Sequence, residues 1–219
     1  MSVEIALRRA RVHYGPLEAL HGLDLPLPAA TVTVLLGRNG AGRTTALRAL
    51  AGTVSLSSGR VLWRGADVTR TPAHERARRG LCFVPDLRAV YATLTVAENL
   101  ELASRDREAA LEAYPELAPL LAHPAGTLSG GERRMLALTR ALLTPARVVL
   151  VDEPALGMSP AVASRTYRLL AALALRGGAA VALAEQRLPP GLPPGTLVHE
   201  LRRGSLAFSG EAAELTSGR

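Results

Sequence analysis

Hydrophobic and polar positions follow two different periods along this chain, and these periods predict its elements. Residues 3–14 and 21–27 alternate between apolar and polar side chains, which is typical of strands with one buried face. Residues 31–36, 148–151 and 179–184 are apolar or β-branched almost throughout, as in strands buried on both faces. Helical spacing fills much of the chain between these strands. The pattern therefore predicts an α/β fold with a mostly parallel sheet and a separate antiparallel part.

The expected helices have recognisable ends. One runs over residues 44–51 and stops at Gly52, because glycine favours the end of a helix. Another follows Ser129, which forms a Ser-x-x-Glu capping box with Glu132. The expected helices are residues 44–51, 72–79, about 130–143 and 160–175, and further short strands are residues 60–64 and 81–84.

Residues 86–127 differ in composition from the rest of the chain. They are rich in alanine, leucine and glutamate, and three prolines break their helical spacing. We interpret this stretch as an inserted helical subdomain. Near the C-terminus, residues 188–194 are too short and too rich in proline for a helix, and residues 196–209 suggest a weak final hairpin.

The overall composition is that of a globular protein. The chain has 219 residues, of which 48% are hydrophobic and 21% charged, so one large domain is expected. No uncharged apolar run approaches the ~18 residues needed to cross a bilayer, which argues against an integral membrane protein. Cys82 is the single cysteine and excludes an internal disulfide.

The balance of charge is unusual. There are 26 basic and 19 acidic residues, a net charge of +7, and every basic residue is an arginine. A GC-rich genome is the simplest cause of the missing lysines. The arginines are scattered along the chain, which favours a solvated basic surface over a stripe that binds nucleic acid.

A glycine-rich turn follows residues 31–36 and precedes the first expected helix. Residues 37–44, hereafter the phosphate loop, fit the pattern Gly-x-x-x-x-Gly-Lys-[Ser/Thr] except at one position. Glycines let backbone N–H groups turn inward around phosphate, and the helix N-terminus adds a partial positive charge. The motif predicts ATP binding, with the Thr44 hydroxyl as a ligand of Mg²⁺. The expected nucleotide-binding residues of this segment are Gly37, Arg38, Asn39, Gly40, Ala41, Gly42, Arg43, Thr44 and Thr45.

Arg43 stands where the motif has lysine. A guanidinium keeps the charge but is larger, planar and forked, so it should fit poorly between the β- and γ-phosphates. We therefore expect ATP binding to survive in weakened form and hydrolysis to suffer more. Two interpretations compete: drift in a genome that disfavours lysine codons, with activity partly retained, or a degraded ATPase. The absence of lysine throughout the chain favours the first.

The apolar run at residues 148–151 ends in two carboxylates. Asp152 is placed to hold Mg²⁺, usually through water, and Glu153 to polarise the attacking water as general base. Carboxylates at the end of a strand are often merely solvated. Beside a phosphate loop, they favour nucleotide hydrolysis.

The most diagnostic stretch is Leu128-Ser129-Gly130-Gly131-Glu132, hereafter the signature segment. A capped helix explains its serine and glutamate but not the paired glycines. The segment resembles the signature of ABC-type ATPases, and the three motifs occur in that family's order. The resemblance covers the chain from Ile5 to about Glu211 and is closest to the ATPase subunits of branched-chain amino acid importers. It is strongest in residues 14–22, 84–85, 94–100, 126–132 and 184–186.

The resemblance implies roles for further residues. The signature segment caps the γ-phosphate held by the opposite subunit, and Tyr14 stacks on adenine. Asp86 falls where the subgroup has glutamate, which senses Mg²⁺ and the γ-phosphate; aspartate is one methylene shorter. Gln186 falls where many relatives have a histidine that contacts the γ-phosphate, and its amide can hydrogen-bond but cannot titrate. The expected catalytic residues are Glu153, Arg43 and Gln186, and the expected metal ligands are Thr44, Asp152 and Asp86.

Together these observations predict a P-loop NTPase with a RecA-like, mostly parallel sheet core, an antiparallel β subdomain and an inserted helical subdomain. The chain would be a single ATP-binding domain over residues 1–219. Residues 1–85 and 136–219 would form the core with its β subdomain, and residues 86–135 the helical signature subdomain.

The expected function is ATP binding and hydrolysis in an ABC-type importer, for amino acids, with ATP and Mg²⁺ as cofactors. The resemblance implies a homo- or heterodimer with another ABC ATPase, membrane permease subunits and, indirectly, a solute-binding protein. It also implies a peripheral cytoplasmic location on the inner face of the membrane. The alternative is a degenerate subunit that binds ATP with little hydrolysis. An ABC ATPase that acts on nucleic acid is disfavoured, since the chain is one short ATPase without duplicated halves.

Overall fold

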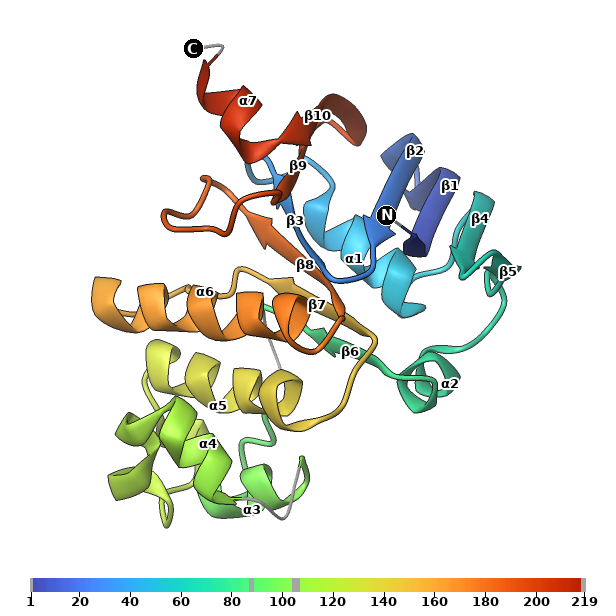
Figure 1. Ribbon diagram of the computed structural model, residues 1–219. Coiled ribbons are helices and arrows are strands. Elements are labelled where there is room, and N and C mark those ends of the chain that lie inside the picture. The colour runs from blue at the N-terminus through green and yellow to red at the C-terminus, as the bar shows by residue number, and fades with distance from the viewer. Residues whose placement is uncertain (1, 87–88, 104–106, 218–219) are drawn as a thin grey trace.

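The computed structural model describes residues 2–86, 89–103 and 107–217, and its strands form two sheets (Figure 1). The smaller sheet is antiparallel and has the order β2-β1-β4-β5. Its two long strands carry the alternating pattern of the N-terminal segment, since one face of each is buried. Its strands are β1 (Val3–Tyr14), β2 (Leu17–Pro28), β4 (Ser58–Trp63) and β5 (Ala66–Asp67).

The larger sheet has the order β10-β9-β3-β8-β7-β6. Its strands pair in parallel from β9 to β6, and only β10 runs antiparallel to its neighbour. Strands β3, β7 and β8 are buried along their whole length, which explains their continuous apolar runs. The strands are β3 (Thr31–Leu36), β6 (Leu81–Val84), β7 (Val148–Asp152), β8 (Ala180–Glu185), β9 (Leu197–Arg202) and β10 (Ser205–Glu211).

Helices cover the two faces of the larger sheet. Alternate residues of β7 divide between two cores: Leu150 packs with α1 and the smaller sheet, and Val149 packs with α5 and α6. In Figure 1, α3, α4 and α5 gather below the sheet, away from β1 and β2. The helices are α1 (Arg43–Ala51), α2 (Ala73–Arg78), α3 (Val96–Glu101), α4 (Arg107–Ala113), η1 (Pro115–Leu120), η2 (Ala125–Thr127), α5 (Gly130–Leu143), α6 (Pro160–Leu175) and α7 (Ala212–Ser217).

The observed elements confirm the predicted fold class. The strands at residues 3–14, 31–36 and 81–84 and the helix at 160–175 have the expected bounds, and β2 begins four residues before the expected 21–27. The short helix α7 follows the final hairpin and was not expected. The division at residues 86 and 135 remains a prediction, although α3, α4 and α5 do share one apolar core.

Arg76, Arg78 and Arg79 form a short basic cluster that suggests a solvated helix face, but Arg76 is buried, with 1% of its surface exposed. Its guanidinium donates to the carbonyl oxygens of Ala49 and Leu50 at 2.9 and 2.7 Å. These carbonyls belong to the last turn of α1, where few backbone donors remain; Ala49 also accepts from the Gly52 N–H at 3.2 Å. Burial lowers the pKa of Arg76. Further bonds go to the carbonyls of Val68, Thr69 and Thr71.

Candidate nucleotide-binding site

The phosphate loop joins β3 to α1 and is packed too tightly for side chains at two of its glycines. A Cβ on Gly37 would lie 2.6 Å from the carbonyl oxygen of Leu201. Gly42 has φ 101°, and a Cβ there would lie 3.0 Å from the carbonyl oxygen of Ala19. The Gly37 N–H donates to the Glu185 carbonyl at 3.1 Å. Neighbouring strands therefore hold this backbone in a shape that leaves room for an anion.

Arg43 is the first residue of α1 and is buried, with 6% of its surface exposed. Its Nη2 donates to the Glu153 Oε1 atom at 2.9 Å. Its Nη1 is also buried, and no described residue accepts a hydrogen bond from it. The forked guanidinium thus neutralises a carboxylate with one nitrogen and leaves the other free to donate.

Asp152 ends β7 with 1% of its surface exposed. Neither of its carboxylate oxygens accepts a well-formed hydrogen bond within the described part of the chain. Burial raises the pKa of Asp152; the Thr44 hydroxyl and the Arg43 charge oppose the shift, and the neighbouring acids add to it. A buried carboxylate whose hydrogen bonding is this incomplete is a ready ligand for a cation.

Glu153 follows directly and has a strained backbone, with φ 51°. Its N–H donates to the Ala184 carbonyl at 3.0 Å, which fixes the residue at the end of β8. The Gln186 Nε2 atom donates to the Glu153 Oε1 atom at 3.3 Å. The structure therefore gathers Arg43, Glu153 and Gln186, the three expected catalytic residues, around one oxygen atom.

Two other predicted residues lie nearer the surface. The Asp86 Oδ1 atom is 4.0 Å from the Nη2 atom of Arg48 on α1, and the Asp86 charge contributes to the raised pKa of Asp152. Tyr14 lies at the tip of the β1–β2 hairpin, and 42% of its surface is exposed. An aromatic ring exposed to this degree has a free face for stacking.

The signature segment begins α5. The Ser129 Oγ atom accepts from the Glu132 N–H at 3.3 Å, and Glu132 Oε2 accepts from the Ser129 N–H at 2.8 Å, which completes the expected capping box. A Cβ on Gly131 would lie 2.5 Å from the Gly157 carbonyl oxygen, whereas one on Gly130 would meet open space. One glycine thus permits close packing, and the other leaves the surface of the segment open.

Two buried groups beside the site, Glu185 and Arg134, have no role predicted from the sequence. Glu185 ends β8, and its Oε1 atom accepts from the Tyr167 hydroxyl at 2.5 Å. Burial raises the pKa of Glu185 to about 7. Arg134 on α5 donates to backbone carbonyls of two strand ends. The position of Glu185 next to Gln186 is a sequence signal that could have pointed to it. No local pattern in the sequence indicates that Arg134 is buried.

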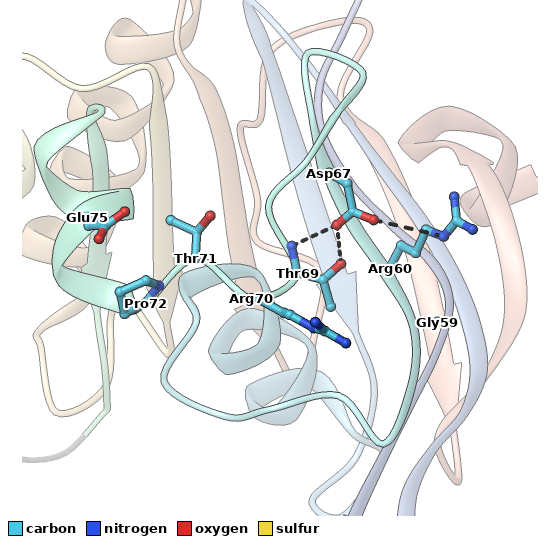
Figure 2. Close-up of a pocket in the computed structure, with 8 residues that line it drawn as sticks. All are labelled: Gly59, Arg60, Asp67, Thr69, Arg70, Thr71, Pro72 and Glu75. Carbon is cyan, nitrogen blue, oxygen red and sulfur yellow. Dashed lines mark hydrogen bonds and ion pairs between the residues drawn. The ribbon is translucent and has the colours of Figure 1, made fainter.

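The phosphate loop borders an open cleft of about 1470 Å³. Residues 36–41 form one wall, and residues 186–188 and 200–203 with Leu215 form the other. Figure 2 shows a different pocket of about 690 Å³, between β4, β5 and the start of α2. Its Asp67 is bonded to Thr69 and paired with Arg60, and none of the predicted site residues lines it.

The site and the sheet define a P-loop nucleotide-binding protein, and the comparisons identify its family. The family model described as "ABC transporter" matches residues 20–156. The chain therefore belongs to the ABC transporter family and is an ABC-type transport ATPase that binds ATP. Among the described residues, no helix is both long enough and apolar enough to pass through a bilayer.

Individual relatives extend over nearly the whole chain. The probable branched-chain amino acid transport ATP-binding protein LivF of Archaeoglobus fulgidus is 36% identical over 211 residues, covering 92% of this chain and 89% of that protein. The high-affinity branched-chain amino acid transport ATP-binding protein BraG of Pseudomonas aeruginosa is 30% identical over 220 residues, covering 96% and 94%. A nucleotide-free ATP-binding cassette from an ABC transporter superimposes with a TM-score of 0.83 at 21% identity, covering 99% of this chain and 94% of that one. This last likeness confirms the fold.

Proposed function

We propose that this chain is the ATP-hydrolysing subunit of an importer for branched-chain amino acids. The two relatives described above support the substrate class, since both carry that name and match this chain over at least 89% of their own length. The comparisons give no support to the alternative of a degenerate subunit.

One observation carries the proposal of hydrolysis. Three buried polar atoms of the site make no well-formed hydrogen bond among the described residues: one guanidinium nitrogen, Arg43 Nη1, and both carboxylate oxygens of Asp152. Such groups cost free energy unless a ligand satisfies them. A triphosphate with a divalent cation supplies the acceptor for the first and the positive charge for the second. The open cleft bordered by the phosphate loop leaves space for it.

Each residue then has a defined task. The phosphate-loop N–H groups and Arg43 Nη1 bind phosphate oxygens, and Tyr14 stacks on the base. Thr44 and Asp152, with Asp86 at the edge, would hold Mg²⁺, which neutralises phosphate charge when bound. No three His, Cys, Asp or Glu side chains cluster as a metal site in the described residues. This agrees with an ion held by one or two carboxylates and by the phosphates themselves.

Glu153 accepts the proton of the attacking water in this proposal. Its Oε1 atom already accepts from Arg43 and Gln186, so the carboxylate is oriented and one of its two oxygens is already engaged. Arg43 therefore binds nucleotide and restrains the base, while Gln186 holds the same oxygen without exchanging a proton. This dual role of Arg43 gives a physical reason for slower hydrolysis than a lysine would allow.

We further propose that two ATPase subunits face each other, each with its signature segment over the other's phosphate loop. The open space at Gly130 supports this, because no described residue lies within 4 Å of a Cβ placed there. The exposed Leu156, in the loop after Glu153, adds an apolar contact for the partner. The dimer would sit on permease subunits at the cytoplasmic face of the membrane and receive solute through a binding protein.

ATP turnover of the purified chain, alone and with its partner ATPase, tests hydrolysis. Glu153→Gln should lower kcat at least about 100-fold, since it removes the base, and Glu112→Gln on the exposed face of α4 should leave kcat unchanged. Arg43→Lys should raise kcat several-fold because the ammonium is more compact and releases Glu153. Equal turnover of Glu153→Gln and native protein would refute the assignment of the base.

Uptake assays test the substrate class. Cells that lack this gene should lose uptake of labelled leucine, isoleucine and valine, and the native gene should restore it where the Glu153→Gln gene does not. Uptake of a basic amino acid serves as the control. Unchanged leucine uptake in the deletion strain would exclude the proposed substrates while leaving ATP hydrolysis intact.

A further inference from the structure

One buried arginine connects three segments that are far apart in the sequence. Arg134 lies in the first turns of α5, and 5% of its surface is exposed. Its Nη1 donates to the Pro85 carbonyl at 2.5 Å, and its Nη2 donates to the Asp152 carbonyl. Pro85 follows β6, and Asp152 ends β7, so a single guanidinium spans the ends of two adjacent parallel strands.

Each of the two carbonyl groups that accept from Arg134 belongs to the residue directly before a proposed site residue. Pro85 directly precedes Asp86, and Asp152 directly precedes Glu153. A shift of either carbonyl therefore moves the backbone of a metal ligand or of the base. Arg134 itself is two residues beyond the signature segment, so it also fixes the direction in which α5 leaves the core.

The bonding of Arg134 is incomplete. Its Nε is buried and donates to no described residue. Burial lowers the pKa of Arg134, while the charges of Asp152, Asp86 and Glu185 favour its ionised form. A cation held this deeply by two carbonyls and surrounded by three carboxylates depends on the arrangement of the site.

We propose that Arg134 is a positioning residue for ATP hydrolysis, which rests on the function proposed above. It holds the strand ends before Asp86 and Glu153 at a fixed separation and ties them to the helix of the signature segment. Displacement of α5 by a partner subunit is thereby transmitted to the base and to the metal ligands. Nucleotide affinity depends mainly on the phosphate loop, so the effect falls on the chemical step.

Arg134→Lys is the sharpest variant, because it keeps the charge but replaces the planar fork, whose two nitrogens each donate to one carbonyl, with one compact ammonium. We expect kcat to fall about 100-fold, as for a misplacement of about 1 Å. The Kd for ADP, measured by calorimetry on the full chain, should stay within about threefold. Arg140→Lys on the same helix, where Arg140 stacks over Tyr91 at 5.2 Å, is the matched control and should change neither quantity.

Hydrogen exchange of the Asp86 and Glu153 amides gives a readout that does not need turnover. Arg134→Lys should speed exchange at both amides, and Arg140→Lys should not. An unchanged kcat, or a loss that parallels the unfolded fraction, would overturn the proposal. A native chain that binds no nucleotide contradicts the proposed function instead, and unaltered exchange in Arg134→Lys would then refute the positioning role independently.

Discussion

Arg76 and Arg134 both join separate pieces of the fold, yet their surroundings differ. Arg76 connects the C-terminal end of α1 to the segment between β5 and α2, and all three of its side-chain nitrogens donate to backbone carbonyls. Arg134 connects α5 to the ends of β6 and β7, and its Nε has no partner among the described residues. No carboxylate influences the pKa of Arg76, whereas three influence that of Arg134.

The difference separates a structural joint from a functional one. Buried polar groups in folded proteins are nearly always satisfied, and Arg76 follows that rule. Among the described residues the rule fails for eight side-chain atoms: four belong to Arg43, Arg134 and Asp152, and the others lie singly on Thr33, Glu116, Arg165 and His199. Several buried polar atoms without hydrogen-bond partners at one site indicate that a ligand or partner supplies the missing bonds there.

The largest expected effect is at the structural joint. Arg76→Met removes five hydrogen bonds to backbone carbonyls, of which Ala49 and Val68 keep a backbone donor, so the free energy of unfolding should fall by about 3 kcal/mol. Arg79→Met is the matched control on the same short helix, where the side chain is 54% exposed, and it should cost no more than about 0.5 kcal/mol. Urea unfolding measures both. Equal losses would show that Arg76 has no special role.

The second prediction concerns the pH dependence of stability, which should come from the buried acids near the phosphate loop. Because the pKa of Glu185 is raised to about 7, the folded chain binds a proton between about pH 4.5 and pH 7 that the unfolded chain releases. The free energy of unfolding should therefore fall as pH rises through this window, by up to about 1.4 kcal/mol per pH unit. Asp152 shifts in the same direction.

Glu185→Gln should flatten this dependence without removing it, because Asp152 still titrates. Urea unfolding of the native chain and the variant at about pH 5 and about pH 7 gives the comparison. If the free energy of unfolding changes equally with pH in both proteins, groups other than Glu185 cause the pH dependence.

Next in size is the contact between the signature segment and the loop at Gly157. Gly131→Ala places a Cβ 2.5 Å from the Gly157 carbonyl oxygen, which should cost about 1–3 kcal/mol of stability. Gly130→Ala faces open space and should be neutral or stabilise by up to about 1 kcal/mol. Thermal unfolding measures the stability of both variants. If Gly130→Ala were the less stable of the two, the segment would be packed differently.

The smallest effects are expected at the two capping boxes. Thr95 caps α3 and Ser129 caps α5 with the same pair of hydrogen bonds, so each change to alanine should cost about 1 kcal/mol. Only Ser129→Ala should also slow ATP turnover, because only that cap belongs to the proposed signature. If Thr95→Ala slows turnover equally, the effect comes from the whole helical part.

Local patterns were sufficient for most of the architecture. The apolar runs gave the parallel strands, glycine and proline gave the helix ends, and the Ser-x-x-Glu pattern gave the start of α5. The phosphate loop and the two carboxylates after residue 151 were found from their spacing, and the structure places Arg43 and Glu153 2.9 Å apart. The burial of Arg76 has no local signal, because its neighbours Arg78 and Arg79 suggest a solvated face.

The sequence by itself determined the order of elements, the glycine-rich loop, the capped signature helix and the unusual arginine in place of lysine, because each depends on near neighbours along the chain. Tertiary structure alone decided what those groups meet. The bond of Arg43 to Glu153 spans 110 positions, and that of Arg134 to Pro85 spans 49. Burial and the pairing of charges are set by segments that meet only when the sheet closes, and no local pattern records them.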